Sequence, residues 1–176
     1  MADVLFGDAD PAGRLPITFP VFEGQLPLVY DHQPTGRGDD YGNLTGQPLF
    51  PFGFGLSYTT FDYSNLQITP DTIAPAGSAT VRCTVTNAGS RAGDEVVQLY
   101  IHDVLATAGR PVMQLEGFRR VHLAPGQSMP VEFRLGPDEL HLVSQQNKWV
   151  VEPGEFRVMV GASSKDIRLR GFLTVR

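Results

Sequence analysis

The sequence predicts an all-β protein: a β-sandwich preceded by a mostly irregular segment rich in proline and glycine. Two observations carry this prediction. From Phe61 onward, apolar and polar residues alternate with the period of two that half-buried strands show. Before that point, seven of the fourteen prolines lie within residues 1–51 and nine of the nineteen glycines within residues 1–55. This spacing excludes any long helix there.

The leading segment is expected to contain little regular structure. We expect residues 2–6 to end a helix that stops at Gly7, and residues 15–19 to form one short strand. Residues 21–55 read as turns with isolated apolar anchors. Because a structureless stretch of this length is uncommon inside a compact domain, we expect it to lie over a neighbouring domain.

The remainder of the chain is expected to form about eight strands. In the clearest of them Val81, Cys83 and Val85 share one face, whereas residues 95–102 are apolar on both faces, as in a central strand. Turn signals of the Pro-Gly type separate the strands at the spacing of a sandwich. The expected strands are 61–68, 79–86, 95–102, 113–122, 129–135, 148–151, 155–160 and 167–175, with a single helical turn at 137–140.

Composition limits the possible partners. A chain of 176 residues holds one domain and at most an incomplete second one. The net charge of −5 lies entirely in residues 1–60, and the absence of a basic cluster predicts no nucleic-acid partner. The sequence has no apolar run long enough for a membrane helix and no targeting signal, so we predict no membrane partner and leave the localisation open. Cys83 is the single cysteine, so no internal disulfide is possible.

Several ordered motifs point to a family. They are GRLPITF at 13–19, PFGFGLSYTTF at 51–61, GDEVVQLY at 93–100, LEGF at 115–118, LAPG at 123–126 and WVVEPG at 149–154. In this order they resemble the C-terminal part of glycoside hydrolase family 3 over nearly the whole chain. The resemblance implies the end of an α/β sandwich domain and linker over residues 1–58, and a fibronectin type III-like (immunoglobulin-like) domain over residues 59–176.

The resemblance also bears on catalysis. Family members are retaining β-glycosidases, in which an aspartate nucleophile and a glutamate acid/base lie about 5 to 5.5 Å apart. Both family positions precede the first residue of this sequence, and no acid here matches either motif. The resemblance therefore implies no catalytic residue, and we expect the chain alone to be inactive. We interpret the pairs Asp8/Asp10 and Asp39/Asp40 as turn or cap residues.

We predict no metal and no cofactor, because the four histidines occur singly and no second thiol is present. The expected role is that of a stabilising module that docks against the catalytic domains of a parent enzyme acting on terminal β-linked glucose or xylose. Alternatively, two copies of the chain would form a homodimer in which each covers the exposed apolar segment of the other, residues 50–61. The expected interdomain docking residues are Arg14, Leu15, Pro16, Phe50, Phe52, Phe54 and Tyr58.

Two other functions stay open at this point. An independent carbohydrate-binding or adhesion module would expose coplanar aromatic side chains on one sheet face, and one half of a split β-glucosidase would regain activity with its upstream half. Trp149 is relevant to the first of these. We expect it to seal the core, since large aromatic residues in sandwiches usually do, and a sugar-stacking platform is the alternative.

Overall fold

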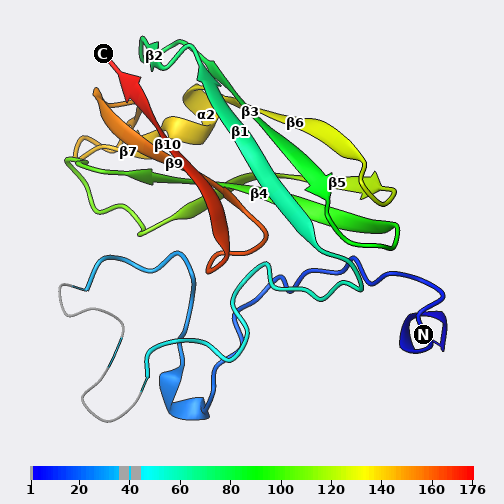
Figure 1. Cartoon of the computed structure of the whole chain (residues 1–176). Coiled ribbons are helices and arrows are strands. Elements are labelled where there is room, and N and C mark those ends of the chain that lie inside the picture. Colours follow the sequence, from blue (N-terminus) through cyan, green and yellow to red (C-terminus); the bar gives the residue numbers. More distant parts are fainter. Residues whose placement is uncertain (1, 36–39, 41–44) are drawn as a thin grey trace.

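The structure is a computed structural model that describes residues 2–35, 40 and 45–176. It contains two packed β-sheets, with the irregular N-terminal segment running along one end of them (Figure 1). One sheet has the order β1-β3-β6, made of β1 (Phe61–Thr69), β3 (Ala79–Asn87) and β6 (Ser128–Leu135). The predicted all-β fold is confirmed.

The second sheet has the order β2-β10-β9-β4-β5. Its strands are β2 (Thr72–Ile73), β10 (Ile167–Val175), β9 (Gly154–Gly161), β4 (Gly93–Asp103) and β5 (Gln114–Leu123). All pairings in the two sheets are antiparallel except the short parallel contact between β10 and β2. A small hairpin of β7 (Leu142–Val143) and β8 (Trp149–Val150) follows the four-residue helix α2 (Pro137–Leu140).

The core forms between the facing surfaces of the two sheets. Val81, Cys83 and Val85 on β3 are fully buried, which confirms the alternation expected for this strand. They pack in one cluster with Leu99 and other inward residues of the second sheet. Burial raises the pKa of the Cys83 thiol to about 11, because the thiolate would lose its hydration.

Strand β4 occupies the interior of its sheet, with β9 on one side and β5 on the other. Val97, Leu99 and Ile101 face the core, while Gln98 and Tyr100 on the opposite face are also buried. The central-strand prediction for residues 95–102 is therefore confirmed. The irregular segment contributes to covering this second face, as described below.

Some local predictions need correction. No strand spans residues 15–19, because Pro16 and Pro20 lack the N–H groups that a ladder requires. Only single contacts form there, an isolated bridge between Phe19 and Phe50 and the backbone bonds of Leu15 with Phe54 and Gly53. The strand expected at 148–151 is reduced to two residues. The helical turn at 137–140 is confirmed, and residues 2–5 form the short helix α1 (Ala2–Leu5).

Two glycines with a left-handed backbone allow the packing of the segment to be tested. Gly53 has φ +79°, and a Cβ at this position would collide with the Gln98 amide; Gly126 has φ +72° and open space around it. We expect Gly126→Ala to lower the free energy of unfolding by about 1 kcal/mol through backbone strain alone. Gly53→Ala should cost about 2–4 kcal/mol, because the buried amide must also move. Urea unfolding measures both, and equal losses would contradict this account.

Candidate functional site

The predicted docking residues divide between those that hold the segment to the sandwich and those that face outward. Arg14 belongs to the first group, since its Nη2 donates to Oε1 of Glu95 at 2.7 Å. Both side chains are largely buried, with exposed fractions of 12% and 6%. Glu95 lies near the start of β4, so this ion pair fixes the segment to the central strand. A buried pair of this kind is costly to break, because it leaves one charge uncompensated.

Phe52 also points toward the sandwich. Its ring stacks on Tyr30 with a centroid separation of 4.1 Å, and Tyr30 in turn contacts Tyr100 of β4 edge-on. The Phe52 carbonyl accepts a hydrogen bond from the backbone N–H of Ser164 at 3.0 Å. Aromatic packing and a backbone bond therefore seat this residue against the end of the second sheet.

Leu15 joins the two crossing stretches of the segment. Its N–H donates to the carbonyl of Phe54 at 2.9 Å, and its carbonyl accepts from the N–H of Gly53 at 2.8 Å. Phe54 packs against Phe50 with centroids 5.1 Å apart. Phe54 and Leu15 are half-buried.

Pro16, Phe50 and Tyr58 remain exposed, so part of the predicted set faces solvent. More generally, large apolar side chains are exposed along the whole segment. Of the seventeen that are exposed among the described residues, twelve lie between residues 5 and 58. We call these the outer apolar residues: Leu5, Phe6, Ile17, Phe19, Val21, Phe22, Leu26, Val29, Leu49, Phe50, Leu56 and Tyr58.

The acid pair Asp8/Asp10 does not form an active-site arrangement. Asp10 accepts hydrogen bonds from the Ser57 hydroxyl at 2.9 Å and from the backbone N–H of Tyr58 at 2.6 Å. This carboxylate therefore ties the start of the segment to its exit, a long-range role that differs from the local turn or cap duty expected for it. The prediction for Asp39/Asp40 lies partly outside the described residues, because Asp39 is not among them.

In the described ranges, no group of three or more His, Cys, Asp or Glu side chains is placed to hold a metal ion. Likewise, no helix in the part of the chain that the structure describes has the length and apolar character needed to cross a membrane.

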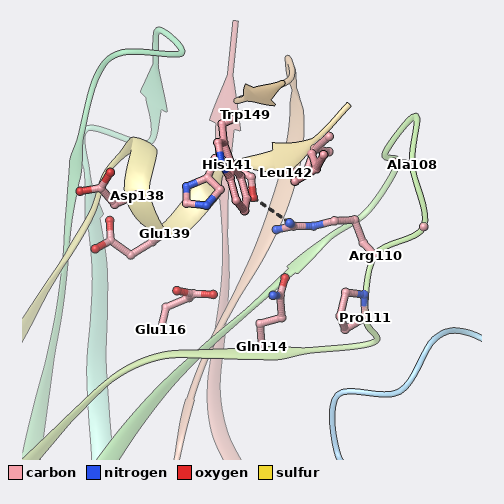
Figure 2. Close-up of a pocket in the computed structure, with 12 residues that line it drawn as sticks. Ala108, Arg110, Pro111, Gln114, Glu116, Asp138, Glu139, His141, Leu142 and Trp149 are labelled. Carbon is pink, nitrogen blue, oxygen red and sulfur yellow. Dashed lines mark hydrogen bonds between the residues drawn. The ribbon is translucent and has the colours of Figure 1, made fainter. Parts of the chain in front are cut away.

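A pocket of about 400 Å³ lies at the β7–β8 hairpin, and no sequence pattern predicts it. Figure 2 shows Gln114 and Glu116 rising from β5 on one side, with Asp138, Glu139 and His141 on the other. The expectation that Trp149 seals the core is wrong, because 70% of its side chain is exposed at this pocket. The hairpin that carries Trp149 is too short to place it between the sheets.

The electrostatics of the pocket centre on Glu116, which is half-buried. Burial raises the pKa of Glu116 to about 7, and the neighbouring negative charge of Glu139 acts in the same direction. Arg110 opposes both effects. The components of this pocket come from residues 108–116 and 138–149, so no local sequence motif signals it.

Comparisons with known proteins agree with this architecture. Residues 1–58 match the Glycosyl hydrolase family 3 C-terminal domain, and residues 95–164 match the Fibronectin type III-like domain. The sandwich thus belongs to the fibronectin type III-like class. The chain is the tail of a glycoside hydrolase family 3 C-terminal domain followed by a fibronectin type III-like domain, and it matches the C-terminal regions of β-glucosidases and β-xylosidases.

Individual relatives are similar along almost the entire chain. A β-xylosidase of Formosa agariphila is 48% identical over 94% of the chain, and the periplasmic β-glucosidase of Salmonella typhimurium is 41% identical over 98%. Among solved structures, a β-glucosidase from Erythrobacter marinus superposes with a TM-score of 0.94 at 41% identity, over 99% of this chain and 23% of that one. The chain spans 23% and 24% of the length of the two curated relatives.

The Arg14–Glu95 pair gives a testable consequence. We expect Arg14→Met to lower the free energy of unfolding by about 2–4 kcal/mol, because Glu95 then stays buried without its partner. The matched control is Arg82→Met, which removes an exposed pair with Glu132 at 3.4 Å. This control should cost less than about 1 kcal/mol. Urea unfolding at moderate salt measures both, and a loss for Arg14→Met no greater than that of the control would refute the anchoring role.

Glu116 predicts a pH dependence of stability. Because its pKa is raised from 4.5 to about 7 in the folded chain, the stabilisation from its neutral form is fully present below pH 4.5 and is lost as pH rises from there through 7. At about pH 8, Glu116→Gln should therefore be more stable than wild type by on the order of 1–2 kcal/mol, measured as a higher urea midpoint, with little difference at about pH 4. The control is Glu155→Gln on β9, an exposed position that should show no such pH-dependent gain.

Proposed function

We propose that this chain is the non-catalytic C-terminal part of a family 3 β-glycosidase, in which it acts as a stabilising and domain-docking module. The parent would hydrolyse terminal β-linked glucose or xylose with retention. The division into a remnant of the preceding domain over residues 1–58 and a fibronectin type III-like domain over residues 59–176 is part of this proposal. It rests on the family membership and on the distribution of exposed apolar surface.

The outer apolar residues are the observation that carries the proposal. The sandwich buries most of its large apolar residues in one cluster, whereas the N-terminal segment exposes most of its large ones. An apolar surface of this kind is normally covered by a partner. The partner that the family membership supports is the catalytic part of the same enzyme. A second copy of the chain is the alternative cover when that part is absent.

The internal anchors suit a docking element. Arg14 and Phe52 hold the segment from within through Glu95 and Tyr30, so its outer face is presented on a fixed base. A preformed surface lowers the entropy lost on association. The segment would therefore transmit the rigidity of the sandwich to the domains it touches.

Hydrolysis with retention needs two carboxyl groups about 5 to 5.5 Å apart, one of them kept protonated. We assign neither role to a residue of this chain. Glu116 has the raised pKa of an acid catalyst, but it lies on the sandwich and not in the segment that matches the family 3 domain. We therefore expect the isolated chain to leave an aryl β-glucoside intact.

A chimera tests the docking role. The region of the Salmonella typhimurium β-glucosidase that aligns with this chain would be replaced by this chain, to which it is 41% identical. We expect the chimera to hydrolyse an aryl β-glucoside. Leu56 is 69% exposed in this chain. In the chimera, Leu56→Asp should lower the specific activity about tenfold or more and should also lower the thermal midpoint, because the interface then buries a lone charge.

The control for the chimera is Phe172→Asp, an equally drastic change at an exposed position on β10. It should leave activity and thermal midpoint near those of the unmodified chimera. A Leu56→Asp chimera as active and stable as this control would refute the docking surface. Hydrolysis by the isolated chain would refute the non-catalytic assignment. Activity restored by mixing the chain with the separate upstream part would instead favour the split-enzyme alternative.

A further inference from the structure

The pocket at the β7–β8 hairpin has the features of a ligand site that the docking role does not use. All its lining residues lie between Ala108 and Trp149, outside the segment that carries the outer apolar residues. Its volume of about 400 Å³ falls within the range of about 300–1,000 Å³ that small-molecule sites occupy. A ligand here would contact the sandwich domain alone.

Trp149 supplies an aromatic surface at the pocket. It is the single tryptophan of the sequence, and 70% of its side chain is exposed. His141 contacts it in an edge arrangement, with ring centroids 4.2 Å apart, and so supports its orientation. Exposing the largest apolar side chain beside a cavity costs solvation free energy, which a stacked ligand would recover.

Hydrogen-bonding groups surround this aromatic surface. Figure 2 shows the carboxyl groups of Glu116, from β5, and Glu139, from α2, as neighbours in the pocket, with the Gln114 amide beside Glu116. Carboxylates accept hydrogen bonds from hydroxyl groups, and an amide both donates and accepts. An aromatic ring flanked by such groups suits a ligand with one apolar ring face and a rim of hydroxyls.

Arg110 adds a buried donor that is not satisfied by the protein. Its side chain is only 10% exposed, and Figure 2 shows it reaching toward His141, whose carbonyl accepts from Nη1 at 2.8 Å. Its Nε–H has no hydrogen-bond partner, since the Asp103 carboxylate is 4.0 Å away. That atom is enclosed beside Asp103, but Arg110 also lines the pocket, and its guanidinium carries further N–H donors for a ligand oxygen.

The charges in the pocket select the class of ligand. The carboxyl groups of Glu116, Asp138 and Glu139 disfavour an anion, and the Arg110 guanidinium offsets part of their negative charge. A neutral polyhydroxylated ring satisfies the donors and acceptors without introducing a charge. We infer that this pocket is a binding site for a neutral pyranose saccharide, which stacks on Trp149 and hydrogen-bonds to Glu116, Glu139 and Arg110.

The single tryptophan allows a direct test on the isolated chain. Cellobiose and xylobiose would be titrated into the wild type while the intrinsic fluorescence of Trp149 is recorded. We expect a saturable change at concentrations from about 1 mM into the tens of millimolar, the range of a weak site. Sorbitol, which has hydroxyls but no pyranose ring, should give no saturable change. This measurement is independent of the chimera, so either proposal can fail alone.

Variants locate the binding. By calorimetry, Trp149→Ala should weaken saccharide binding about tenfold or more through loss of stacking. Glu139→Ala should weaken it about fivefold or more in the fluorescence assay, through loss of a charge-assisted hydrogen bond. Phe172→Ala, an exposed aromatic position on β10, is the control and should bind as wild type does. Circular dichroism establishes that each variant is folded.

Three results would overturn the inference. The first is no saturable response to either disaccharide, and the second is undiminished binding by folded Trp149→Ala. The third is a saturable response to tetramethylammonium with none to the saccharides, which would make the pocket a cation site.

Discussion

The structure depends on how one buried amide is satisfied. Gln98 lies on the central strand β4, where its side chain is 3% exposed. Its Nε2 donates to the carbonyl of Gly53 at 3.1 Å and to that of Ala162 at 2.6 Å, and its Oε1 accepts from the Tyr100 hydroxyl at 2.6 Å. These bonds join the N-terminal segment, the turn after β9 and the sheet itself. Since a buried amide without partners is costly, the segment and the sandwich stabilise one another.

The sequence was sufficient to predict the sandwich, because alternation in stretches such as Val81 to Val85 directly reports which side chains face the core. It was insufficient for Leu15 to Phe19, where apolar residues suggest a strand but the flanking prolines prevent a ladder. The place of Trp149 depends on the length of its hairpin, which is set by packing between distant residues. The pocket likewise joins residues 108–116 to residues 138–149, a proximity that only the folded topology creates.

The two surfaces of the chain differ in chemistry. The N-terminal segment presents isolated large apolar side chains on a base fixed by Arg14 and Phe52. The hairpin pocket is polar, with one aromatic ring and a partly desolvated carboxyl group. Apolar surface supports a lasting contact between domains, whereas a polar pocket with one ring supports reversible binding of a small hydrophilic molecule. On the two proposals made above, the fold separates a docking surface from a ligand-binding surface.

The position of Cys83 in the middle of the core has a practical consequence. Only the thiolate form of a cysteine reacts with alkylating agents. In the native chain the raised pKa of Cys83 disfavours the thiolate, and the complete burial of the side chain keeps the reagent away from the sulfur. Fraying of the leading segment leaves Cys83 enclosed, because its side chain packs in the core between the two sheets. The rate of thiol labelling therefore depends on the opening of the whole sandwich and is unaffected by local motions at its edges.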